Sequence, residues 1–164
     1  MTSSPSEKIA ELLSGEICRS VVGGFGAGSI IHVGLGNLIK RDIPLKNEKL
    51  SLLEREFDTS KSLFVSCAWR FTFEKGSAIS WRDSGIDQTW DALSQLNGKK
   101  ITNVSTSESN LDLKLCFEDS HVLDLFCDIT TDYESDENYR IHSTDVVYTI
   151  GICSDFTYEK KPAW

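Results

Sequence analysis

The chain has 164 residues, the size of one ordinary domain, and it is 40% hydrophobic and 26% charged, a composition that excludes general disorder. No apolar run approaches the ~18 residues of a membrane span, and residues 1–8 lack the pattern of a secretory signal, so we expect a cytoplasmic protein that makes no membrane contact. The formal net charge of −8 repels phosphate backbones, and we therefore expect no direct contact with nucleic acid.

The N-terminal half of the chain predicts a helix followed by a hairpin. Ser4-Pro5-Ser6-Glu7 has the form of a capping box with proline at the first helical position, so we expect a helix within residues 1–14. Period-two patterns then predict strands over 17–22 and 30–35. The glycine-rich segment 23–29 between them fits a hairpin connection better than a phosphate loop, because no Gly-Lys-Ser/Thr follows it. Residues 36–61 give no clear pattern.

The rest of the chain predicts one more helix and a series of strands. Alternating apolar residues predict a strand over 63–73, a short return strand follows at 78–81, and residues 84–97 have helical periodicity ended by Asn97-Gly98. The later strands are expected at 101–106, 111–117, 122–128, 139–143 and 145–153, with an acidic loop at 130–138 and a polar tail at 159–164. We therefore predict a single α+β domain over residues 1–164. Its sheet is predominantly antiparallel, with about seven to nine strands and two to three helices packed on one side.

The acidic residues are unevenly distributed along the chain. Residues 1–82 hold 11 basic and 9 acidic residues, whereas residues 83–164 hold 6 basic and 16 acidic ones, so the second half carries −10. The acids are densest between Asp112 and Glu137. Two interpretations stay open: a solvated face that keeps the protein soluble, or a surface that attracts a basic partner.

No pattern in the sequence indicates a catalytic or metal site. The five cysteines contain no C-x-x-C pair and the three histidines lack metal-ligand spacing, so we expect reduced thiols and no metal. Asp124 and Asp128 would lie roughly 13 Å apart along a strand, farther than the paired carboxylates of glycosidases. The acidic loop lacks the glycine of a calcium-binding loop. We expect no enzymatic activity and no cofactor.

Several short motifs resemble those of a known group of proteins. They are Gly28-Ser29, Leu35-Gly36, Cys67-Ala68-Trp69-Arg70, Ser84 to Asp87, Leu96-Asn97-Gly98-Lys99-Lys100-Ile101, Leu113-Lys114-Leu115-Cys116-Phe117 and Leu123-Asp124-Leu125-Phe126. In this order they resemble small acidic bacterial immunity proteins, which are encoded beside the toxins of polymorphic and contact-dependent growth-inhibition systems. The resemblance covers roughly residues 15–130 and carries over no catalytic residue. It implies a β-rich α+β domain that neutralises a toxin by binding it.

We therefore expect an immunity protein, monomeric on its own, that binds the C-terminal domain of a cognate toxin, which we take to be a basic nuclease. Acidic side chains with neighbouring aromatic ones suit an interface with a basic protein. The residues predicted to bind this partner are Asp124, Asp128, Asp132, Tyr133, Glu134, Asp136, Glu137 and Tyr139. Two alternatives stay open. One is a self-associating adaptor or structural subunit, and the other is a small ligand-binding or enzymatic domain with a cleft that sets a histidine against a carboxylate.

Overall fold

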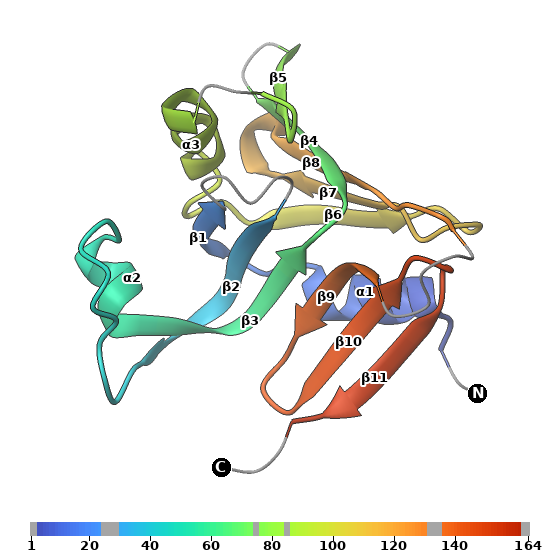
Figure 1. The fold of residues 1–164 in the computed structure, drawn as a ribbon, viewed down its shortest axis with the longest axis horizontal. Helices are drawn as coiled ribbons and strands as arrows, with labels where there is room; N and C mark the ends of the chain where they lie inside the picture. The colour runs from blue at the N-terminus through green and yellow to red at the C-terminus, as the bar shows by residue number, and fades with distance from the viewer. Residues whose placement is uncertain (1–2, 24–29, 74–75, 84–85, 131–135, 162–164) are drawn as a thin grey trace.

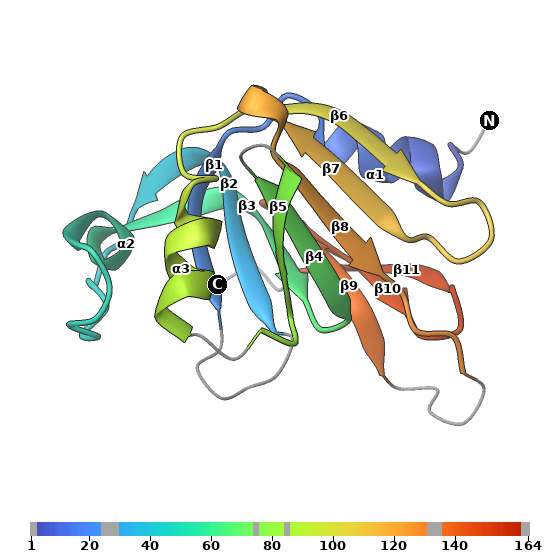
Figure 2. The ribbon, with the colours of Figure 1, turned by 90° about the horizontal axis from the view of Figure 1, so that it is seen from above.

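A computed structural model of the chain describes residues 3–23, 30–73, 76–83, 86–130 and 136–161 (Figure 1). Within these residues the chain forms eleven strands in two antiparallel sheets and three α-helices, which confirms the predicted α+β class. The strands number more than the seven to nine expected. They also divide between two sheets that share one core (Figures 1 and 2).

The larger sheet has six strands in the order β1-β2-β3-β9-β10-β11. These strands are β1 (Cys18–Gly23), β2 (Ile31–Lys40), β3 (Phe57–Val65), β9 (Glu137–His142), β10 (Val146–Gly151) and β11 (Phe156–Lys160). The expected glycine-rich hairpin is confirmed, since β1 and β2 pair antiparallel across the segment 24–29, which lies outside the described residues. Parts of the predicted acidic loop (130–138) and of the predicted polar tail (159–164) are strand. Glu137 and Asn138 belong to β9, and β11 extends into the tail as far as Lys160.

The smaller sheet has five strands in the order β5-β4-β8-β7-β6. These are β4 (Ala68–Phe73), β5 (Ser77–Ser80), β6 (Ile101–Thr106), β7 (Leu113–Phe117) and β8 (Val122–Phe126). The single strand expected over 63–73 is in fact two strands, one in each sheet. The chain changes sheets at Ser66 and Cys67, whose backbone N–H groups both donate to the carbonyl of Asn138 at 2.8 and 3.0 Å.

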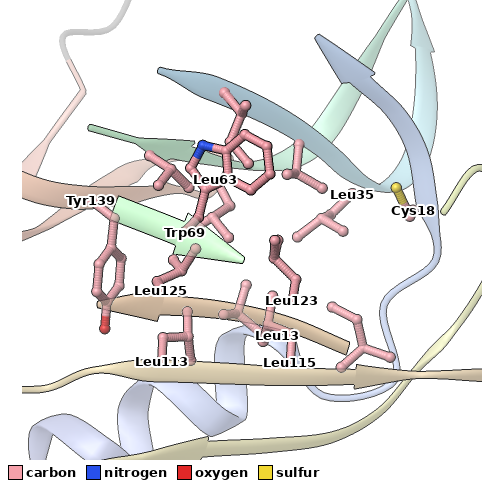
Figure 3. Close-up of a cluster of buried hydrophobic side chains, with 14 of the residues drawn as sticks. Leu13, Cys18, Leu35, Leu63, Trp69, Leu113, Leu115, Leu123, Leu125 and Tyr139 are labelled. Carbon is pink, nitrogen blue, oxygen red and sulfur yellow. The ribbon is translucent and has the colours of Figure 1, made fainter. Parts of the chain in front are cut away.

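The core lies between the two sheets (Figure 3). Leu35 and Leu63 enter it from the larger sheet, and Trp69, Leu115 and Leu125 enter it from the smaller one. In the three strands of the smaller sheet the residues that alternate with these are less buried and point outward, as the two-residue period of a strand requires. One face of each sheet is thus apolar and buried, and the other carries the polar groups that could act on a ligand or partner.

The helices are α1 (Pro5–Leu13), α2 (Leu52–Glu56) and α3 (Ile86–Ser94), and they do not form a single layer (Figure 2). Helix α1 begins with the expected capping box between Ser4 and Glu7, and it contacts β6. Its residue Leu12 accepts a hydrogen bond from Lys61 of β3 at 2.9 Å, so α1 closes one side of the space between the sheets. Helices α2 and α3 contact β3 and β1 respectively.

In the part of the chain that the structure describes, no helix has the length and apolar character needed to cross a membrane.

Candidate functional site

An acidic hollow lies where β8 ends, β9 begins and β10 ends. It has a volume of about 560 Å³ and is lined by Ser66, Asp128, Asp136, Glu137 and Ile152. Three of the predicted partner-binding residues, Asp128, Asp136 and Glu137, therefore meet at one place on the surface. No lysine or arginine is among the described residues that line this hollow.

The buried side chain of Asn138 connects the segments that line the acidic hollow. The side chain is buried (1% exposed) at a bulge in β9. Its amide oxygen accepts a hydrogen bond from the Asp128 backbone at 2.8 Å, and its amide nitrogen donates to the carbonyls of Asp128 and Gly151 at 3.1 and 3.0 Å. These bonds fix the segment after β8 against the end of β10. The relative positions of Asp128 and Asp136 thus depend on a buried, fully hydrogen-bonded amide.

The surroundings of the acidic hollow combine charge with apolar surface. Ile129, next to Asp128, is 62% exposed, and Ile152 forms part of the lining. Glu137 is partly neutralised, because its carboxylate lies 2.8 Å from Nε of Arg140. The side chains of Asp128 and Asp136 carry the remaining negative charge of the lining.

Two predicted site residues lie away from the acidic hollow. Asp124 is on the outer face of the smaller sheet, between Arg70 on β4 and Lys114 on β7, and its carboxylate is 3.2 Å from the Arg70 guanidinium. Its side chain is only 14% exposed, and the cross-strand pair with Arg70 partly offsets its charge. Tyr139 is fully buried, and its hydroxyl donates to the Leu111 carbonyl at 2.9 Å. Tyr139 is therefore a core residue, and the prediction that it lies on the binding surface is wrong.

The other predicted site residues, Asp132, Tyr133 and Glu134, lie outside the described residues. The acidic surface supported by the structure therefore consists of Asp128, Asp136 and Glu137. No three His, Cys, Asp or Glu side chains within the described segments are arranged to hold a metal ion.

A second hollow, which we call the cationic pocket, lies on the outer face of the larger sheet and was not predicted. It has a volume of about 310 Å³, and its lining includes His32, Asp58, Arg140, His142 and Lys161. These residues come from strands β2, β3 and β9 and from the end of β11, up to 129 positions apart in sequence. No local motif could therefore signal it. The available signal was alternation, which places His32, Arg140 and His142 opposite the buried positions of their strands.

The chain matches no protein-family model, no curated protein and no solved structure. The geometry of the two hollows and the charges around them therefore carry the functional argument.

Proposed function

We propose that this chain is a cytoplasmic bacterial immunity protein that neutralises a toxin by binding its C-terminal effector domain one to one. The observation that carries the proposal is the acidic hollow, where Asp128 and Asp136 surround a space of about 560 Å³ without a basic residue in the described lining. The sequence resemblance to immunity proteins supplies the class of partner.

The acidic hollow suits a basic side chain of a partner protein. A lysine or arginine that enters it would lie beside the carboxylates of Asp128 and Asp136, for which the described lining offers no basic partner. A hydrogen bond between two charged groups is stronger than one between neutral groups. The exposed Ile129 beside it supplies apolar surface to bury around this contact. The long-range attraction of the acidic half would raise the association rate. A nuclease whose basic cleft normally holds phosphates would be blocked by such a surface.

Co-expression tests this function directly. The probe is the C-terminal 150–250 residues, roughly one domain, of the protein encoded immediately upstream of this chain. We expect a one-to-one complex in pull-down and restored growth of cells that express this fragment. A fragment that is harmless and forms no complex would reject the proposal.

A pair of charge-reversal variants tests the surface. D128K/D136K changes two side chains that make no hydrogen bond to any residue the structure describes, and E48K/E108K makes the same change in charge at two exposed positions elsewhere. We expect D128K/D136K to slow association at least about tenfold and to flatten its salt dependence, with the control near wild type. Equal effects of the two variants would mean that total charge, and not the acidic hollow, governs binding.

Self-association is a second candidate, because the segment from the end of β2 to α2 exposes apolar side chains. Six large apolar residues there are exposed: Leu38, Ile39, Ile43, Leu45, Leu52 and Leu53. An apolar surface of this kind often marks an interface. Light scattering across a concentration series separates the candidates. A monomer throughout removes self-association, whereas a dimer that L52D/L53D dissociates supports it.

A further inference from the structure

The cationic pocket is lined by basic residues, although the molecule as a whole is negatively charged. Arg140 and Lys161 both line it, although the chain as a whole carries −8. Asp58 is the carboxylate among the described lining residues, and it is paired with Arg41 at 3.1 Å. Lys61 contributes to the wall, but its ammonium is engaged by the Leu12 carbonyl and the Glu16 carboxylate. Arg140 is also ion-paired, because its Nε lies 2.8 Å from the carboxylate of Glu137, which lines the acidic hollow and not this pocket. Among the described lining residues themselves, the cations therefore outnumber the one carboxylate.

Neighbouring contacts fix where the two cations stand. The Arg140 guanidinium lies 5.0 Å from the centre of the Phe64 ring, which faces it across the β3–β9 pair. A guanidinium stacked in this way keeps its donors in a defined plane. Lys161 donates to the Ser143 carbonyl at 2.6 Å, which places its ammonium at the end of β9 beside His142.

Two histidines supply further hydrogen-bonding groups. Ser62 pairs with His142 and Phe64 with His32 across the sheet, so both imidazoles project from its outer face. Burial lowers the pKa of His32, with a smaller lowering from Arg41 and an opposing effect from Asp58. Burial also lowers the pKa of His142, as do Lys161, Arg140 and His32, against an opposing effect of Glu159. Both rings are therefore largely neutral at pH 7, and each offers one N–H donor.

We propose that the cationic pocket binds a small oxyanion, as free phosphate or sulfate or as the phosphoryl group of a small molecule. The pocket supplies a planar guanidinium, an ammonium, imidazole N–H groups and the hydroxyls of Ser60 and Ser62 around one space. This is the donor set that oxyanions take in proteins. Its volume of about 310 Å³ exceeds one free phosphate and falls at the lower end of small-ligand pockets. The pocket shares no lining residue with the acidic hollow, but the two are neighbours, because Arg140 of the pocket pairs with Glu137 of the hollow at 2.8 Å. K161Q, which leaves this pair intact, therefore tests the pocket separately from the acidic hollow.

The chain carries its own reporters for this site. Two of the three histidines line the pocket, and the third, His121, is buried elsewhere, with hydrogen bonds to Gln95 and to the Asp119 carbonyl. We would follow the Cε1–H signals of all three by NMR while adding sulfate against a chloride control of equal ionic strength. Sulfate keeps its charge between pH 5 and 8, so any titration belongs to the protein. We expect saturable shifts of His32 and His142 with His121 unchanged, and an upward shift of the pKa of both pocket histidines on binding.

Matched variants decide whether the pocket is responsible. R140Q and K161Q should each lower sulfate affinity at least about tenfold, as the loss of one charge-assisted contact predicts. R70Q is the control. Like Arg140, Arg70 stacks on a phenylalanine (Phe126) and pairs with a carboxylate (Asp124), but it lies on the other sheet. If R140Q fails to fold, K161Q at the end of β11 still tests the site. Uniform movement of all three histidines, no saturable shift, or an equal effect of R70Q would overturn the proposal.

A last comparison distinguishes the two sources of the oxyanion. Inorganic phosphate and adenosine monophosphate are titrated in the same way as sulfate. Tighter binding of the nucleotide would support an organic phosphate as the occupant, and equal or weaker binding would support the free ion. Failure of all three probes would reject the site and leave the proposed toxin binding untouched.

Discussion

The buried hydroxyl of Tyr139 should contribute measurably to the stability of the fold. Its O–H donates to the Leu111 carbonyl at 2.9 Å, and burial raises the pKa of its phenol. Tyr139→Phe keeps the ring but removes the donor from a buried acceptor. We expect the free energy of unfolding to fall by about 1–3 kcal/mol, measured by urea denaturation.

The control for this change is Tyr158→Phe, because Tyr158 is 70% exposed. This variant should stay within about 0.5 kcal/mol of wild type. If Tyr139→Phe also leaves stability unchanged, the buried hydroxyl contributes nothing to the stability of the core.

The cysteines should differ sharply in reactivity. Cys18 is fully buried, and this burial raises the pKa of its thiol to about 12, so almost no thiolate is present at pH 8. Cys153 is exposed. We expect iodoacetamide at pH 8 to label Cys153 within minutes and to label Cys18 only when urea is added, as followed by mass spectrometry of tryptic peptides. Rapid labelling of Cys18 in the folded protein would mean that the start of β1 opens to solvent.

Stability should depend on pH through the two pocket histidines. The pKa of His32 and of His142 is lowered in the folded state, so between that value and 6.5 the unfolded chain binds more protons. The free energy of unfolding should therefore fall as the pH drops through 6.5, by at most about 1.4 kcal/mol per pH unit for each histidine. Urea titrations in chloride between pH 7.5 and 5.5 measure the slope, and His142→Gln should reduce it. A slope that His142→Gln leaves unchanged would assign it to other groups.

The candidate site shows what the sequence can and cannot tell at the level of single residues. The sequence singled out Asp128, Asp136 and Glu137 by their local density of charge, and the structure places these three around one hollow. Whether they bind a partner stays a prediction. The sequence could not tell that Asp124 pairs with Arg70 or lies opposite Lys114, since these neighbours are set by strand register between distant segments. It also could not tell that Tyr139 points inward, because the inward face of β9 depends on the bulge at Asn138.

At the level of elements, two capping boxes of the same kind allow a direct comparison. Ser4 and Ser51 each accept a hydrogen bond from the third helical residue at 3.2 Å. Helix α1 buries Ile9, Leu12 and Leu13, whereas α2 has five residues and buries none. Ser4→Ala should therefore cost about 1 kcal/mol of global stability, and Ser51→Ala should cost almost nothing, as measured by urea denaturation. Equal losses would mean that α2 folds together with the core.

The strengths and failures of element prediction have physical causes. Strands β4, β7 and β8 alternate cleanly and lie close to their predicted positions, since one face of each is buried. The division at Ser66 and Cys67 was missed, because the alternation runs on while the chain passes to another sheet. Strand β11 is an edge strand in which four of five residues are exposed, so burial imposes little pattern on it.

For the whole molecule, the main question is how the two sheets are joined. At one end, backbone bonds connect the start of β1 with the start of β6: Ile101 donates to Glu16 at 2.8 Å, and Cys18 donates to Lys99 at 2.9 Å. At the other end the connection passes through Asn138. Its backbone and side chain together bind the β3–β4 passage, the segment after β8 and the end of β10. The sandwich is thus joined by backbone bonds at one end. At the other end it is joined by Asn138, together with the Thr130–Ile152 backbone bond at 3.2 Å and the Tyr139 hydroxyl.

Asn138→Ala should accordingly weaken the whole fold and not one loop. It removes three side-chain hydrogen bonds and leaves the Asp128 N–H and the carbonyls of Asp128 and Gly151 without this partner. We expect a loss of about 3 kcal/mol or more in the free energy of unfolding, still in one cooperative transition. The exposed Asn103→Ala is the control and should change stability by less than about 0.5 kcal/mol. Asn138→Asp should be at least as harmful as Asn138→Ala, because it places a carboxylate oxygen against two carbonyls. Hydrogen exchange that rises only near the acidic hollow in Asn138→Ala, with global stability retained, would show that the sheets are held together by core packing without this amide.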